Sequence, residues 1–194
     1  MSVKEAASET DTRARALRLI EEVRALPYRW PAPPDAAAAA RDGYGTCASK
    51  HALLAERLRA IGIESAHLFV VGPLVPPSLC HLEELRDAAG LLEVHECLTV
   101  FTPWAGPLLV DVTWDPPLLA NGLQGVAPWD GASDMPYAIV TDGRAWAAPQ
   151  QSLRAAKEAI RARLYTSDQR AIRDRALAAL STLFGTWRDR QERE

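Results

Sequence analysis

Apolar residues recur every three or four positions in four stretches of the chain, with charged residues between them. This period is typical of helices that bury one face. Pro27 ends the first stretch, and Gly62 stands just past the second, where glycine commonly ends a helix. Helices are therefore predicted over residues 11–26, 46–61, 150–163 and 167–184, with a polar lead at 1–10 and a charged tail at 188–194.

Between the second and third helices the pattern changes to short alternating or apolar runs bounded by Gly and Pro. Such runs predict strands, and strands joined by short turns usually pair antiparallel. The expected fold is α+β, with a helix packed on an antiparallel sheet and further helices at both ends. Strands are predicted over residues 63–71, 91–101 and 108–114, with a last small hairpin at 137–147.

Composition excludes several classes of protein. The chain has 194 residues, 48% of them hydrophobic and 24% charged, which fits one globular domain spanning 1–194. The net charge is −3 and no stretch is strongly basic, so a nucleic-acid partner is not expected. The sequence shows neither an apolar leader nor a run of apolar residues long enough to span a membrane. With three cysteines, we expect reduced thiols and a cytoplasmic location.

The stretch around Cys47 stands out, because it places a cysteine where a glycine-bearing turn becomes a helix. The first turn of a helix leaves backbone N–H groups unpaired, and the helix dipole puts partial positive charge there. A thiol at such a position is biased toward thiolate, the nucleophilic form. Cys47 is therefore a candidate nucleophile.

Two further residues complete a possible catalytic group. His95 follows Cys47 by 48 residues and lies in a predicted strand, and Asp111 follows by another 16 in the next strand. An imidazole near a thiol can take its proton and return it to a leaving group. A carboxylate on the other ring nitrogen fixes the tautomer. Asp111 lies in an apolar run, where a carboxylate is costly unless it has a partner.

Residues 43–115 resemble the transglutaminase-like superfamily. Gly45-Thr46-Cys47-Ala48-Ser49-Lys50-His51 is similar to its nucleophile helix, and Val94-His95-Glu96-Cys97 and Leu109-Val110-Asp111-Val112-Thr113-Trp114 are similar to its His and Asp strands. The resemblance implies a papain-like core, and the helical pattern after it predicts a C-terminal extension at about 150–187. It also implies a thiol hydrolase or acyltransferase that acts on a peptide, protein or small amide, with no metal or cofactor. Cys47 would be the nucleophile, His95 the general base and acid, and Asp111 the orienting carboxylate.

Three other residues have weaker claims to a place in this site. The family often supplies an aromatic or amide side chain to the oxyanion hole, and Tyr44 and Trp30 are the candidates here. His51 lies one helical turn after Cys47. It is expected at the surface or behind the site rather than as the base. The four tryptophans at 104, 114, 129 and 146 either line a cleft or fill the core.

Alternatives remain open at this stage. Cys80, His81, His95 and Cys97 have the composition of a zinc site, but adjacent strand residues point in opposite directions and no C-x₂-C pair is present. Cys97 is also a conceivable redox partner of Cys47. A binding or scaffold protein of the same fold would need no turnover. An arylamine acetyltransferase is disfavoured because the Arg-Gly-Gly expected before the cysteine is missing.

Overall fold

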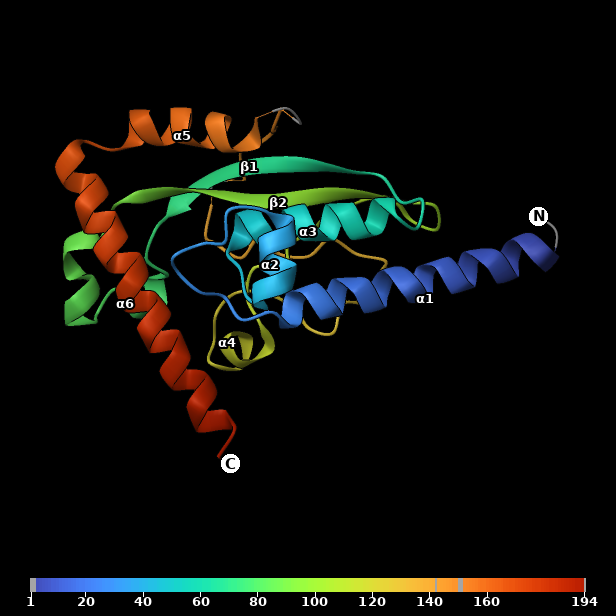
Figure 1. Cartoon of the computed structure of the whole chain (residues 1–194), viewed down its shortest axis with the longest axis horizontal. Helices are drawn as coiled ribbons and strands as arrows, with labels where there is room; N and C mark the ends of the chain where they lie inside the picture. Colours follow the sequence, from blue (N-terminus) through green and yellow to red (C-terminus); the bar gives the residue numbers. More distant parts are fainter. Residues whose placement is uncertain (1–2, 142, 150–151, 194) are drawn as a thin grey trace.

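The computed structural model describes residues 3–141, 143–149 and 152–193. It confirms the α+β class, with helices packed on a four-stranded antiparallel sheet and helices at both ends of the chain (Figure 1). The helices are α1 (Val3–Ala25), α2 (Ala36–Asp42), α3 (Cys47–Arg59), α4 (Pro116–Ala120), α5 (Leu153–Leu164) and α6 (Ser167–Gln191), with short 3₁₀ helices η1 (Pro77–Leu79) and η2 (Glu83–Ala88). The strands are β1 (Ser65–Pro73), β2 (Leu92–Thr102), β3 (Gly106–Val110) and β4 (Ala145–Ala147).

The sheet has the strand order β3-β2-β1-β4, and each neighbouring pair is antiparallel. Strand β2 pairs with the whole of β1, from Leu92 opposite Pro73 to Val100 opposite Ser65. Strand β3 pairs only with the far half of β2, starting at Leu98. The first half of β2 therefore has β1 on one side and no β3 on the other, and the candidate site lies at this edge.

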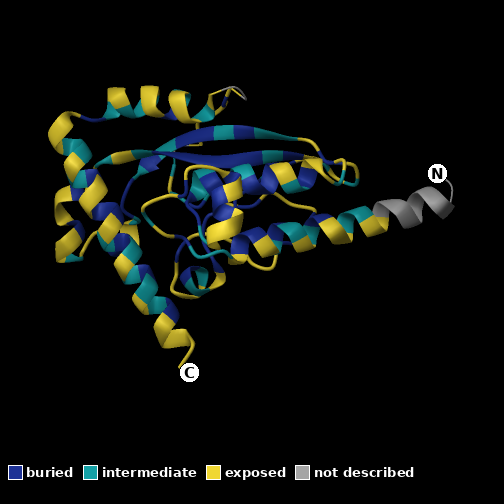
Figure 2. Cartoon of the chain, viewed as in Figure 1, coloured by how far each residue is buried: buried dark blue, intermediate teal, exposed yellow. Residues whose placement is uncertain are grey.

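Helices cover the two sides of the sheet. Helices α1 and α3 lie on one side and α5 on the other (Figure 1). Leu54 and Leu58 of α3 belong to the main core cluster with apolar residues of α1, β2 and β3. On the other side, Leu153 and Ile160 of α5 pack against a small cluster containing Phe69. Figure 2 shows the resulting buried band along β1 and β2 and the exposed outer face of α5.

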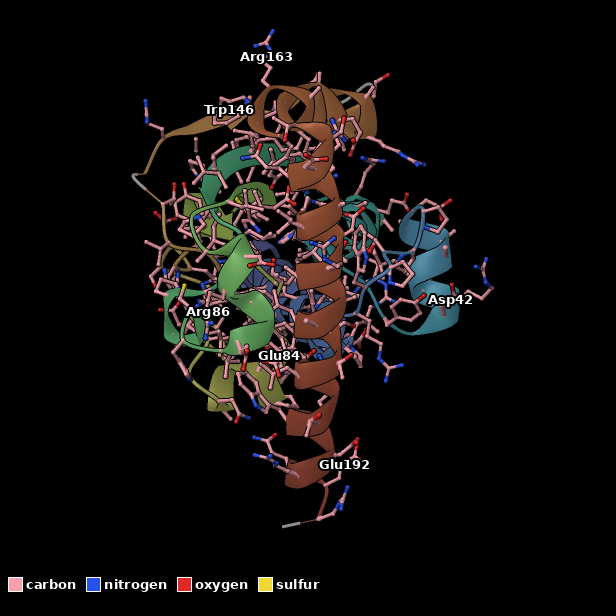
Figure 3. The ribbon with its side chains drawn as sticks, turned by 90° about the vertical axis from the view of Figure 1, so that its left-hand side faces the viewer. Asp42, Glu84, Arg86, Trp146, Arg163 and Glu192 are labelled. Atoms are coloured by element: carbon pink, nitrogen blue, oxygen red, sulfur yellow. The ribbon has the colours of Figure 1, made fainter. Side chains whose placement is uncertain are left out.

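Helix α6 runs across one end of the molecule, from near Arg163 to Glu192, with η2 beside it (Figure 3). Its apolar side packs against residues of η2 and α4 in a second core cluster. Near its end the buried Arg188 donates from Nη2 to Asp115 Oδ2 at 2.5 Å. The predicted charged tail is therefore wrong at residues 188–191, because this buried ion pair holds the last turns of the helix against the core.

Several predicted boundaries are also wrong. Helix α1 begins at Val3 rather than at residue 11, because residues 3–10 are mostly good helix formers that extend it. The strand predicted over 108–114 ends at Val110, since side chains of α3 bind the backbone beyond that residue. Among the described residues of the predicted hairpin at 137–147, only those of β4 form a strand, and this strand pairs with β1.

Some predictions fall on positions outside the described residues: Asp142 at the expected hairpin turn, and residues 150–151 at the expected start of α5. Within the described part of the chain, no helix is both long enough and apolar enough to cross a membrane.

Candidate functional site

Cys47 is the first residue of α3, and the chain enters the helix through a tightly constrained turn. The backbone N–H of Thr46 donates to Ser49 Oγ at 3.1 Å, and the first backbone hydrogen bond of the helix runs from Lys50 to Thr46. A Cβ at Gly45 would lie 2.8 Å from the Lys50 side chain, so a larger residue would displace it. The backbone N–H groups of Cys47 and of the residue after it belong to the first turn of α3. Residues four positions earlier are outside the helix, so these N–H groups have no helical carbonyl partner and point out of the end of the helix.

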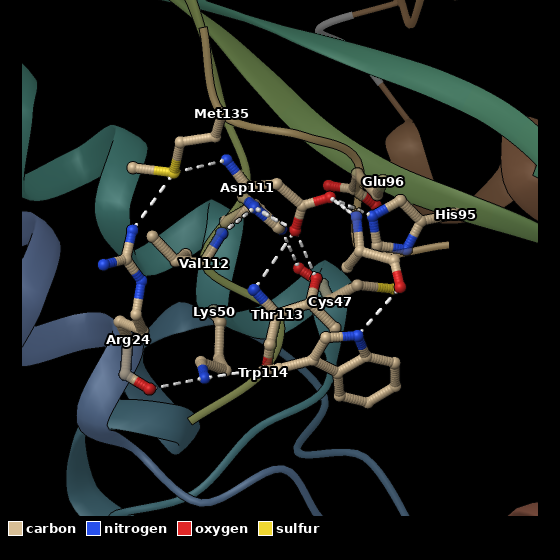
Figure 4. Close-up of polar contacts among 12 residues, drawn as sticks. Arg24, Cys47, Lys50, His95, Glu96, Asp111, Val112, Thr113, Trp114 and Met135 are labelled. Carbon is tan, nitrogen blue, oxygen red and sulfur yellow. Dashed lines mark hydrogen bonds and ion pairs between the residues drawn. The ribbon is translucent and has the colours of Figure 1, made fainter. Parts of the chain in front are cut away.

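The structure brings His95 and Asp111 together beside this cysteine (Figure 4). His95 Nε2 lies 2.6 Å from Asp111 Oδ2, and both side chains are buried. Asp111 Oδ2 also accepts from the Ala138 N–H at 2.8 Å, while Oδ1 accepts from the N–H and hydroxyl of Thr113 at 3.1 and 2.7 Å. Four hydrogen bonds thus compensate the buried carboxylate.

These contacts set the protonation of the pair. Burial alone would lower the pKa of His95, but the charge and hydrogen bond of Asp111 and the contact with Cys47 raise that pKa to about 10. Burial would likewise raise the pKa of Asp111, but the charge and hydrogen bond of His95 hold it well below its ordinary value. The raised pKa favours the charged form of His95 at neutral pH, with Nε2 bound to Asp111 and the Cys47 side chain as its second contact.

A second cation reaches the sulfur from the C-terminal part of the chain. Lys157 of α5 donates from Nζ to Cys47 Sγ at 3.3 Å, and its Nζ lies 3.6 Å from Glu96 Oε2. Burial would raise the pKa of the Cys47 thiol, but the charges of Lys157 and His95, with a hydrogen bond from His95, lower it to about 7. The thiol is thus partly ionised at neutral pH.

The role of Lys157 was not predicted from the sequence. Its position between Leu153 and Ile160 on the apolar face of α5 is a weak signal, because the stem of a solvated lysine often packs on such a face. Tyr28 was also missed, although it lines both cavities that meet Cys47.

His51 and Lys50 hold the segment that carries Asp111. His51 Nδ1 donates to the Cys47 carbonyl at 2.6 Å, and its Nε2 accepts from the Val112 N–H at 3.0 Å. Burial lowers the pKa of His51 to about 4, which keeps it neutral for these two roles. It is fully buried rather than at the surface, and it lies behind the site. The ammonium of Lys50 donates at 2.9 Å to three backbone carbonyls, including that of Thr113.

Cys47 lies at the meeting point of two cavities. The smaller, of about 240 Å³, is lined mainly by apolar side chains together with His95. The larger, of about 530 Å³, extends past Lys157 toward a proline-rich loop and contains several charged groups. The thiol is partly exposed, so a molecule can reach it from either side. Residues lining the smaller cavity include Val94, Trp114, Leu123, Ile139 and Leu180, and those lining the larger include Trp30, Pro33, Glu56, Arg161 and Arg173.

The two aromatic candidates for the oxyanion hole lie in different places. Trp30 lines the larger cavity, where the Arg173 guanidinium lies 5.2 Å from the centre of its ring. Tyr44 is not among the described residues of either cavity, and its ring instead faces Arg29 at 6.0 Å. Trp104 and Trp146 are also away from both cavities, whereas Trp114 lines the smaller one and Trp129 belongs to the main core.

The described residues offer no group of three or more His, Cys, Asp or Glu side chains suited to a metal ion. Cys97 is buried, Cys80 is exposed, and both are free thiols, as is Cys47. Cys47 is partly exposed and has a lowered pKa, whereas Cys97 is buried and burial raises its pKa. The chain matches no protein-family model, no curated protein and no solved structure.

Proposed function

We propose that this protein is a cysteine hydrolase or acyltransferase that acts on amide or ester bonds through Cys47, His95 and Asp111, on a transglutaminase-like core. One observation carries the proposal: the partly exposed thiol at a helix start faces a buried imidazole that is bound to a buried carboxylate. This arrangement provides a nucleophile, a proton carrier and an orienting group.

In the first step the Cys47 thiolate attacks the carbonyl carbon and forms a C–S bond, while the π electrons move to the oxygen. The unpaired N–H groups at the start of α3 are placed to receive the developing negative charge. The His95 imidazolium then gives its proton to the leaving nitrogen or oxygen, the bond to that atom breaks, and a thioester remains on Cys47.

In the second step water or an amine attacks the thioester and gives its proton to neutral His95. The C–S bond breaks, the acyl group leaves as an acid or a new amide, and the thiolate–imidazolium pair is restored. Throughout, Asp111 keeps the ring oriented and stabilises its charged form, because its four hydrogen bonds leave it no freedom to turn.

The two cavities favour a substrate that lies across the thiol with its ends in different surroundings. The smaller cavity suits an apolar group, since most of its described lining is aliphatic or aromatic. The larger cavity suits a polar or charged group, because Glu56, Arg161 and Arg173 line it and do not line the smaller one. A peptide-like or small amide substrate with one apolar end fits both.

A binding protein of the same fold is the second candidate. The observation that favours a binding protein is that α5 covers the thiol, with Lys157 lying directly against the sulfur. In such a protein the thiol would be reactive, but it would not turn over an acyl substrate.

The proposal is tested with p-nitrophenyl acetate and with alkylation by iodoacetamide. The wild-type protein is expected to release a burst of p-nitrophenolate equal to the amount of protein, followed by steady turnover, and prior alkylation should abolish both. Cys47→Ala should lose burst and turnover while keeping its circular dichroism spectrum. Cys80→Ala is the matched control, because that thiol is exposed and lies outside the site.

Mass spectrometry of the alkylated protein identifies the reactive residue. At pH 7 we expect Cys47 to react severalfold faster than Cys80, because the larger thiolate fraction that its lowered pKa gives outweighs the weaker nucleophilicity of such a thiolate. Equal rates would overturn the activated-thiol proposal. Fast alkylation without any burst on esters or amides would support the binding protein instead.

A further inference from the structure

Lys157 is the most unusual side chain outside the predicted catalytic group. Its side chain is only 5% exposed, and buried lysines need a partner to remain charged. Its Nζ lies within 3.3 Å of the sulfur and 3.6 Å of a Glu96 carboxylate oxygen, so it has two anionic partners. It comes from α5, which lies on the side of the sheet opposite to α3, and it reaches Cys47 at the edge where β3 does not cover β2.

The Glu96 carboxylate has a second polar partner besides Lys157. Its other oxygen, Oε1, lies 2.9 Å from Nδ1 of His67 on the neighbouring strand β1. His67, Glu96 and Lys157 thus form a continuous line of polar contacts that ends at the sulfur. We call these three residues the lysine arm, and His95 with Asp111 the histidine arm.

We propose that Lys157 is a further catalytic residue, a fixed cation that keeps Cys47 as thiolate before substrate binds, with Glu96 as the residue that positions it. The inference deepens the proposed function and rests on it for the role of Cys47. Three features carry it: the distance to the reacting atom, the burial of the ammonium, and the second anion that fixes its direction. Lys157 transfers no proton, and it acts only through its charge.

Other charged groups act on the same atoms. The thiol faces His95 and Glu96 of β2, Lys157 of α5 and the phenol of Tyr28. Lys157 faces Cys47, Glu96 and Glu93, with Arg161 nearby on its own helix. Arg161 binds Glu93 and Glu158, and Arg173 binds Glu93 and Asp174, so both guanidinium groups are paired with carboxylates. Lys157 is therefore the cation on α5 whose removal should directly change the pKa of the Cys47 thiol.

The test is the pH dependence of Cys47 alkylation by iodoacetamide, in which the thiolate displaces iodide and forms a thioether. Lys157→Met should move the midpoint of the profile up by about one pH unit, because an opposite charge next to a thiolate lowers its pKa by one unit or more. The alkylation rate at pH 6 should fall severalfold. The plateau at high pH should not fall, since a thiolate of higher pKa is intrinsically the stronger nucleophile.

Lys157→Arg should keep the midpoint within a few tenths of a unit of wild type, because it restores the charge. Arg163→Met is the matched control: it removes an exposed cation near the end of the same helix, outside both cavities, and should leave the profile unchanged. If Lys157→Met does not fold, as judged by circular dichroism, Lys157→Gln against Lys157→Arg makes the same comparison.

An unchanged midpoint in a folded Lys157→Met or Lys157→Gln protein would overturn the inference even if the ester burst is intact. Conversely, a shifted midpoint in a protein whose wild type shows no burst would retain Lys157 as the thiolate's cation and reject the proposed acyl transfer. A lower plateau with an unshifted midpoint would mean that Lys157 affects only access to the thiol, which also overturns the inference.

Discussion

The histidine arm and the lysine arm both end at the sulfur of Cys47. Each contains one of two neighbouring residues of β2, His95 and Glu96, but the two arms are built differently. His95 is bound to a carboxylate that accepts four hydrogen bonds, two of them from backbone N–H groups. Lys157 lies at the end of a long side chain on a helix from the other side of the sheet, and Glu96 contacts it at 3.6 Å. The histidine arm is the more rigid of the two.

The arms also differ in what their charges can do. The pKa of His95 is raised to about 10, so the ring can still lose its proton within the range where enzymes work. Burial opposes the charge on Lys157, but the thiolate and Glu96 outweigh burial and raise the pKa of Lys157 above its ordinary value. The histidine arm can therefore move a proton, whereas the lysine arm only holds a charge. This difference predicts that damage to the two arms gives different kinetic signatures.

The largest effect is expected from the carboxylate of the histidine arm. Asp111→Asn keeps the shape of the side chain but removes the anion that raises the pKa of His95. We expect turnover of p-nitrophenyl acetate to fall by roughly 10³-fold, because the orienting carboxylate of such a triad contributes on this scale. Asp134→Asn is the matched control, since that exposed carboxylate binds the Leu109 N–H and does not touch His95. A loss of less than about tenfold in Asp111→Asn would contradict the role assigned to Asp111.

The histidine arm is also the part that the sequence reveals. Cys47, His95 and Asp111 are predictable because each residue type is unusual for its local pattern: a cysteine at a helix start, and polar residues inside apolar strand runs. What the pattern does not show is that the chain leaves the sheet after Val110. Lys50 and His51 of α3 bind the backbone of Thr113 and Val112, and these tertiary contacts replace strand pairing.

The lysine arm could not be assembled from sequence alone. Lys157 lies 110 residues after Cys47, and a lysine in an amphipathic helix is normally solvated, with only its stem packed. The same limit applies to Arg188, whose position in a charged C-terminal run predicts a tail although it is buried against Asp115. In both cases the partner is an anion fixed by tertiary structure, so the local period carries no sign of it.

The pH profile of turnover distinguishes the two arms, because a variant of each arm should shift a different limb of the profile. In the wild type we expect activity to rise as Cys47 ionises around pH 7 and to fall as His95 loses its proton around pH 10. Lys157→Met should raise the thiol pKa and move only the acid limb upward. If the pKa rises from about 7 to about 8, the thiolate fraction at pH 7 drops about fivefold. Asp111→Asn should instead move the alkaline limb down, because His95 loses its stabilising anion. Identical shifts of both limbs in the two variants would remove the distinction between the arms.

The smallest effect is expected from Glu96, because its removal acts on the thiol in two opposing ways. The Glu96 carboxylate raises the pKa of Cys47 through its charge, so Glu96→Gln lowers that pKa directly. The same change frees Lys157 from one of its two anions and lets the ammonium move away, which raises the pKa of Cys47. We expect the alkylation midpoint to stay within about half a unit of wild type and turnover to change by roughly threefold at most.

The matched control for Glu96→Gln is Glu84→Gln, which removes an exposed carboxylate of η2 that lines neither cavity. A midpoint shift in Glu96→Gln as large and in the same direction as that of Lys157→Met would mean that the ammonium stays against the sulfur only while Glu96 holds it. A downward shift of a full unit would contradict the positioning role of Glu96, because only the direct effect of its charge on Cys47 would then remain.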